Sequence, residues 1–194
     1  MKIAVRAFVA ALFAACLFPA AAANLDEPLI LVARPELADP VFGHSVLIVV
    51  PATNGQHVGF IVNRPSSVTL GKLFPDHAAS QKLVDPVYMG GPVAAGVLFA
   101  LVQRRASPGG NSFEVLPGLY VAYESPVVDR VIESDPEHAR FLAGLVTWRP
   151  GELQSEIDLG AWIGLDADAE LAMRKPDGLW DELVLRWQQR SNSI

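Results

Sequence analysis

Apolar and polar positions are most clearly patterned in residues 44–65, where two apolar runs flank Asn54 and Gly55. Asn-Gly between apolar runs is the strongest short signal for a β-hairpin, because both residues tolerate positive φ. With Asn54 and Gly55 as the two central turn residues, Val50 faces Gly59 across the hairpin. Both faces of the strands then carry apolar side chains, so both faces must be covered by other elements. We therefore expect this hairpin to lie in the middle of the fold.

The rest of the chain alternates short apolar runs with turn signals. Ser125 and Pro126 form a favourable helix start, with Ser at the N-cap and Pro in the first turn. Strands are predicted at 29–33, 87–89, 96–102, 113–116, 119–123, 139–148 and 162–166, and helices from Ser66 or Ser67 through Leu73, at 125–133, over the residues before Gly160 and at 179–190. Hairpin strands with a few helices between them indicate a single α+β domain.

The first 23 residues have the three-part pattern of a secretory signal peptide. Lys2 and Arg6 precede an uncharged apolar run over 7–18, and the small residues Ala20 to Ala23 follow. The apolar run is too short for an ordinary transmembrane helix. We expect cleavage after Ala23, which leaves a domain of residues 24–194 in the periplasm or secreted, with no stable membrane anchor. The alternative is a cytoplasmic protein that keeps this segment as a helix.

Charge and cysteine content narrow the possible chemistry. Cys16 is the only cysteine. It lies in the cleaved segment within a poor lipoprotein box, so we expect neither lipidation nor thiol chemistry. Loss of Lys2 and Arg6 lowers the basic residues from 15 to 13 against 21 acidic ones, a net charge of −8. An acidic domain without a basic cluster is poorly suited to nucleic-acid partners.

No motif for a metal, a cofactor or a nucleophile is present. The four histidines have no metal-ligand spacing, there is no Gly-x-Ser-x-Gly elbow, and Gly90-Gly91-Pro92 lacks the Gly-Lys-Ser/Thr of a phosphate loop. We therefore predict no metal and no cofactor.

Three segments carry a family resemblance. They are Asp39-Pro40-Val41-Phe42 with Ser45-Val46, Gly59 and Asn63-Arg64-Pro65, then Val87 to Val93 with Gly90-Gly91-Pro92, and finally Trp148, Gly151, Leu153, Glu156 and Trp162. Together they resemble the AlgH/YqgE family of bacterial proteins, over about Leu29 to Trp187. Glu152 and Gln154 depart from the family's usual Gln and Glu.

The resemblance implies a fold but no settled activity. The implied fold is a mixed, largely antiparallel, partly barrel-like curved sheet surrounded by helices. Familiar members look cytosolic and begin near Leu29. They usually carry histidines at the positions of Ala52 and Val102, so any activity that depends on those histidines is absent here.

Three strand ends, each followed by proline, suggest a rim where a small ligand or a protein partner binds. Its candidate residues are Asn63, Arg64, Gly90, Gly91, Trp148, Arg149, Glu152 and Glu156. The structural alternative has Asn63 satisfying a turn, Arg64 paired with Glu156, and Trp148 in the core. We expect a ligand- or partner-binding domain with no established catalysis. A hydrolase using the rim carboxylates is one rival. A transcriptional regulator is disfavoured by the acidic charge and the lack of a DNA-reading motif.

Overall fold

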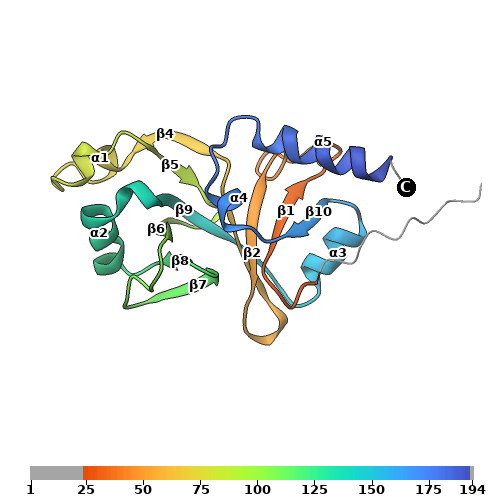
Figure 1. The fold of residues 1–194 in the computed structure, drawn as a ribbon, viewed down its shortest axis with the longest axis horizontal. Helices are drawn as coiled ribbons and strands as arrows, with labels where there is room; N and C mark the ends of the chain where they lie inside the picture. Colours follow the sequence, from red (N-terminus) through yellow and green to blue (C-terminus); the bar gives the residue numbers. More distant parts are fainter. Residues whose placement is uncertain (1–23, 193–194) are drawn as a thin grey trace, which may run out of the picture.

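The computed structural model describes residues 24–192, and the expected signal peptide lies outside them. In this range the chain forms ten strands and five α-helices (Figure 1). The strands are β1 (Leu29–Ala33), β2 (Val46–Pro51), β3 (His57–Ile61), β4 (Pro65–Thr69), β5 (Pro86–Met89), β6 (Val93–Gln103), β7 (Ser112–Leu116), β8 (Leu119–Ala122), β9 (Ala139–Trp148) and β10 (Trp162–Asp166). The helices are α1 (Leu70–Leu73), α2 (Ser125–Ser134), α3 (Glu152–Asp158), α4 (Ala169–Met173) and α5 (Leu179–Ser191).

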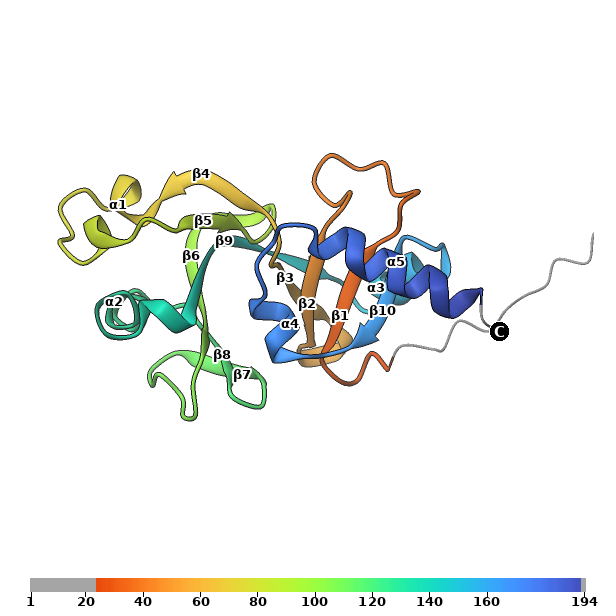
Figure 2. The ribbon, with the colours of Figure 1, turned by 45° about the horizontal axis from the view of Figure 1, so that its top comes forward.

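The strands form one curled sheet with two halves that share β9. Along the sheet the order is β10-β1-β2-β3-β9-β6-β8-β7, and β4 and β5 form an arm in which β5 runs parallel to β9. We call the parts on either side of β9 the β1–β3 half, which includes β10, and the β4–β8 half (Figures 1 and 2). The remaining pairings are antiparallel. The expected fold class, a mixed, largely antiparallel, curved α+β domain, is confirmed.

The β2–β3 hairpin is buried on both faces, as its pattern predicts. Val46, Ile48, Phe60 and Val62 belong to a central core that also contains Leu183 and Val184 of α5. Leu47, Val49 and Ile61 face a second core closed by Leu153 of α3. Helices α5 and α3 therefore cover opposite faces of the β1–β3 half. A third core lies under α2, where Val127, Val128, Val131 and Ile132 are buried as expected.

The predicted hairpin register is wrong by one residue. Val50 pairs with Val58 rather than with Gly59. The Ala52 N–H donates to the Gln56 carbonyl over 2.8 Å, so the connection contains three residues instead of two. Asn54 and Gly55 do adopt positive φ, at 59° and 73°. The extra loop residue exchanges the faces of β3, because side chains alternate along a strand.

Three local predictions need correction. Residues 65–69 form strand β4 instead of the start of a helix, because Pro65 and Thr69 pair with Tyr88 and Pro86 of β5. Helix α2 begins where expected, but Glu124 is its N-cap residue and makes no side-chain capping bond. Helix α4 was not predicted; its N-cap Asp168 accepts hydrogen bonds from the Glu170 and Leu171 N–H groups.

Glycines allow the two halves to cross closely. A Cβ on Gly91 would lie less than 3.0 Å from the Leu145 carbonyl group, and one on Gly90 equally close to the Gly144 carbonyl oxygen. Gly144 itself has φ of 74°. Beyond Gly144 the alternation of side chains between the two faces of β9 shifts by one residue. Leu142 faces the central core, while Val146 faces the core under α3. In a regular strand these two side chains would share one face.

Candidate functional site

The structure does not gather the predicted rim at one place. Trp148 pairs with His57 at the first residue of β3, whereas Asn63 and Arg64 follow the last residue of that strand. Six residues of extended chain separate the two positions by about 20 Å. Gly90 does lie beside Asn63 and Arg64, since its carbonyl accepts the Ile61 N–H over 2.9 Å. The prediction of one shared rim is therefore wrong for the other four residues, Trp148, Arg149, Glu152 and Glu156.

Asn63 and Arg64 hold the loop before β2. The Asn63 side chain accepts the Val46 N–H over 2.8 Å and donates to the His44 carbonyl over 2.9 Å. The Arg64 guanidinium donates to the carbonyls of Pro40, Val41 and Gly43. The alternative pairing of Arg64 with Glu156 is also wrong. Both side chains thus hydrogen-bond the backbone of the loop before β2 and hold it in place.

Glu156 joins α3 to two strands. Its Oε2 atom accepts the indole N–H of Trp148 over 2.9 Å and that of Trp162 over 2.7 Å. Glu152 accepts the backbone N–H of Arg149 over 2.8 Å at the start of α3. The two carboxylates therefore have separate structural partners, and the Trp-Glu-Trp spacing of the third motif is explained by this clamp, with Trp148 and Trp162 both buried.

We expect Glu156→Ala to lower the free energy of unfolding by about 3 kcal/mol, because it leaves two buried indole N–H groups without their charged acceptor. Glu156→Gln keeps one neutral acceptor oxygen and should lose only about 1 kcal/mol. Gln154→Ala, on the exposed face of the same helix, is the control. Urea titration followed by tryptophan fluorescence measures all three, and equal midpoints for Glu156→Ala and Gln154→Ala would contradict the clamp.

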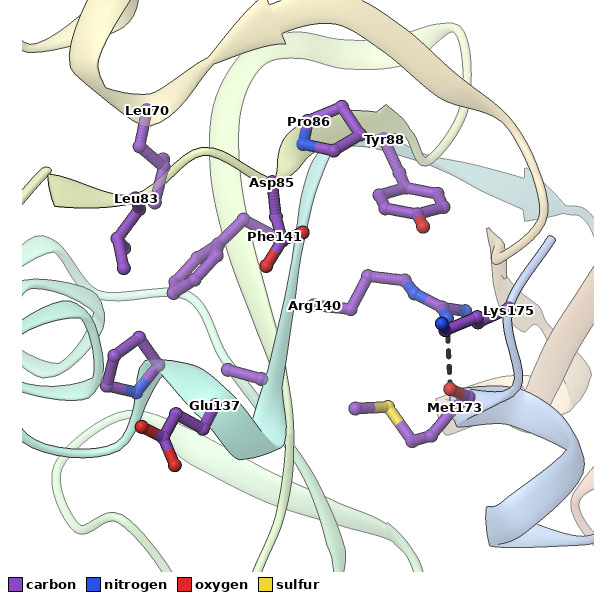
Figure 3. A pocket seen from close by; sticks show the side chains of 12 residues that line it. Leu70, Leu83, Asp85, Pro86, Tyr88, Glu137, Arg140, Phe141, Met173 and Lys175 are labelled. Carbon is purple, nitrogen blue, oxygen red and sulfur yellow. Dashed lines mark hydrogen bonds between the residues drawn. The ribbon is translucent and has the colours of Figure 1, made fainter. Parts of the chain in front are cut away.

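A pocket of about 260 Å³ lies where the two halves meet (Figure 3). It opens between β5, the start of β9 and the end of α4, and we call it the junction pocket. Its lining residues are Leu70, Leu83, Asp85, Pro86, Tyr88, Pro136, Glu137, Ala139, Arg140, Phe141, Met173 and Lys175. None of them was among the residues predicted for the rim.

Arg140 is the one charged residue of this pocket that is buried in the described chain, with 7% of its surface exposed. Its Nη1 atom donates to the carbonyls of Val62 and Ala172 over 2.7 and 2.8 Å. Its Nη2 atom donates to the carbonyls of Met173 and Arg174 over 3.0 and 2.6 Å. Three of these four carbonyls lie at the C-terminal end of α4, where the helix dipole favours a cation.

Within residues 24–192, the charge of Arg140 has no acidic partner. None of the salt bridges within residues 24–192 includes it, and the Tyr88 ring lies 4.6 Å from its guanidinium carbon. Burial lowers the pKa of Arg140 from its ordinary value, and the neighbouring Tyr88 side chain opposes that shift. A buried cation with only dipolar partners can attract an anionic group into the pocket.

A signal for Arg140 is present in the sequence, since it is a lone charged residue at the start of the apolar run 139–148. Asp85, Glu137 and Lys175, by contrast, lie on connections, and only the assembled fold brings them to the same cavity.

Two other features that would bear on function are a metal-binding group and a membrane-spanning helix. Over residues 24–192, no three His, Cys, Asp or Glu side chains come together as a metal-binding group. In the same part of the chain, no helix has both the length and the apolar character needed to cross a membrane.

The curled, largely antiparallel sheet with five α-helices in residues 24–192 defines the chain as a small α+β protein, and comparison shows its family. The AlgH-like family model (DUF179) matches residues 30–191. A UPF0301 protein from Myxococcus xanthus is 32% identical over 158 residues, which is 79% of this chain and 86% of that protein. The chain belongs to the AlgH-like family.

Solved structures agree with this assignment. The solution structure of AlgH from Pseudomonas aeruginosa has a TM-score of 0.68 at 26% identity, covering 81% of this chain and 86% of the other. A crystal structure of a Corynebacterium diphtheriae protein has a TM-score of 0.69 at 22% identity, covering 90% and 94%. The second likeness concerns the fold alone.

Proposed function

We propose that this AlgH-like domain binds a small ligand in the junction pocket. The observation that carries the proposal is Arg140, a buried cation without an acidic partner in the described chain, which lines the pocket between β5, the start of β9 and the end of α4. Burying a cation without a carboxylate partner is costly, and an anionic ligand group would offset part of that cost. The lining comes from segments far apart in the sequence, so the pocket exists only in the folded domain.

The contacts of the rim carboxylates do not favour the rival hydrolase. Glu156 accepts two indole N–H groups and Glu152 accepts a backbone N–H, so neither is placed as a free general base. The protein-partner alternative for Asn63, Arg64, Gly90 and Gly91 stays a separate proposal, since the Asn63 and Arg64 side chains already bind the backbone of the loop before β2.

Native mass spectrometry of protein purified from its own host tests ligand binding. Leu83→Trp fills the pocket from a partly buried wall position, and Leu159→Trp, with 86% of Leu159 exposed and outside the pocket, is the matched control. We expect wild type and Leu159→Trp to carry the same added mass and Leu83→Trp to lack it. Thermal melts establish that both variants fold. An added mass retained by Leu83→Trp, or absent from wild type, would overturn the proposal.

We also propose that the domain is exported and acts in the periplasm or as a secreted protein. The support is the sequence pattern of residues 1–23 alone. Residues 1–30 fused to a reporter that is active only outside the cytoplasm should give an active reporter. Recovery of the protein from the cytoplasm with Met1 intact would contradict export.

We expect the domain to show no appreciable binding to duplex DNA at physiological salt. Its net charge of −8 after loss of residues 1–23 offers few phosphate contacts, and those contacts supply most non-specific affinity. Fluorescence anisotropy with a labelled duplex measures this. Micromolar binding that weakens as salt rises would revive the regulator hypothesis.

A further inference from the structure

We propose that the junction pocket accepts a small zwitterion with an apolar side chain, the chemical class of free apolar amino acids. This inference rests on the proposed function, because it names the ligand of the same pocket.

The charges of the pocket lining balance, although the whole protein is acidic. Arg140 and Lys175 supply two cations, and Asp85 and Glu137 supply two carboxylates. Within the described chain Asp85, Glu137 and Lys175 form no salt bridge. A neutral set of unpaired charges favours a ligand that carries both signs, because an anion alone would satisfy the cations and leave the carboxylates to repel it.

The opposite charges lie at different ends of the pocket (Figure 3). The side chains of Arg140 and Lys175 both lie on the side of the pocket where Tyr88 and Met173 are seen. The carboxylate of Asp85 lies over Phe141, and Glu137 lies further from the two cations. A carboxylate at the Lys175 end and an ammonium at the Asp85 end would therefore each meet a group of opposite charge.

The hydrogen bonds of Arg140 define how it can act on a ligand. The four hydrogen bonds of Nη1 and Nη2 all go to backbone carbonyls, so the guanidinium cannot also form a bidentate fork with a phosphate. It acts as a fixed positive charge beneath the ligand. The exposed ammonium of Lys175 remains available for direct contact with a carboxylate.

The apolar wall and the size of the pocket complete the ligand description. Leu70, Leu83 and Phe141 line the pocket on the side away from Lys175. An aliphatic or aromatic side chain of the ligand would bury its surface there. The volume of about 260 Å³ lies below the roughly 300–1,000 Å³ of drug-sized sites, so one amino acid fits better than a nucleotide or a longer peptide.

Isothermal titration calorimetry on the purified protein tests the ligand class. The probes are L-leucine and L-phenylalanine, with L-leucinamide lacking the carboxylate and N-acetyl-L-leucine lacking the ammonium group. We expect saturable binding of at least one of the two amino acids. Both leucine derivatives should bind at least tenfold more weakly than leucine, since each leaves one end of the pocket without its counter-charge.

Two variants test which end of the pocket contacts the carboxylate of the ligand and which end contacts its ammonium group. Lys175→Gln and Asp85→Asn should each weaken amino-acid binding about tenfold without changing the melting temperature, because both side chains are exposed. Lys82→Gln and Asp76→Asn make the same charge changes on the nearby β4–β5 arm outside the pocket, and they should bind as wild type does.

Other results of these experiments would contradict the ligand class, the location of the site or the proposed function. Equal binding of N-acetyl-L-leucine and leucine would make the pocket an anion site and end the zwitterion proposal. Unchanged binding by both pocket variants would place the amino acid elsewhere. If no amino acid binds while Leu83→Trp still removes a co-purifying molecule, the ligand class is wrong and the proposed function stands. If Leu83→Trp removes nothing, the proposed function itself fails.

Discussion

Gly91→Val should prevent the protein from reaching its native state. The added Cβ would lie less than 3.0 Å from the backbone of Leu145 and from a side-chain carbon of Val146, where the two halves cross. Neither neighbour is the end of a flexible side chain that could move aside. We expect a loss on the order of 4 kcal/mol or more, which is a large share of the stability of a single domain.

Gly96→Val is the matched control, because it places the same side chain on a glycine of β6 with nothing within 4 Å of the new Cβ. Circular dichroism melts of both variants measure the difference. We expect Gly96→Val to melt within a few degrees of wild type and Gly91→Val to be insoluble or to melt without a cooperative transition. A Gly91→Val protein as stable as Gly96→Val would show that β5 and β9 can separate at this crossing.

Arg140→Met is expected to be the second most damaging change. Methionine fills similar volume but leaves the carbonyls of Val62, Ala172, Met173 and Arg174 without their donor in a buried position. Each unpaired buried carbonyl costs about 1–3 kcal/mol, and some will find water through the pocket. We expect a total loss of roughly 4 kcal/mol, measured by chemical denaturation.

Arg130→Met provides the control, since Arg130 is exposed on α2 and should change stability by less than about 0.5 kcal/mol. Arg140→Lys separates charge from hydrogen bonding. It keeps the cation but cannot reach four carbonyls in two directions, so its stability should fall between wild type and Arg140→Met. Full stability in Arg140→Met would show that Arg140 is not needed to hold α4 against β9.

The sequence was most informative about individual elements. The Asn54-Gly55 signal correctly placed a hairpin that is buried on both faces. It did not determine the register, because two positive-φ residues fit a three-residue connection as well as a two-residue one. Two adjacent glycines before proline permit a close backbone approach, but only the fold shows that Gly90 and Gly91 approach β9.

The candidate site was less predictable, because it depends on which strands pair. Trp148 and Asn63 both end apolar runs, but the antiparallel pairing of β3 with β9 places them far apart. The third family motif was recognised from its spacing, whereas its physical role became clear only when both indole groups were seen to meet Glu156. The junction pocket combines a strand start, a helix end and connections, and no local pattern links those segments.

The central position of β9 affects how the protein unfolds. It pairs with β3, β5 and β6, and its side chains enter all three cores, through Leu142, Phe141 and Val146. Neither half can release its section of β9 without exposing apolar surface that belongs to the other. We therefore expect the two halves to melt in one transition, and a fragment that ends before residue 139 lacks the strand with which both halves pair. We expect that neither half folds by itself as a smaller domain.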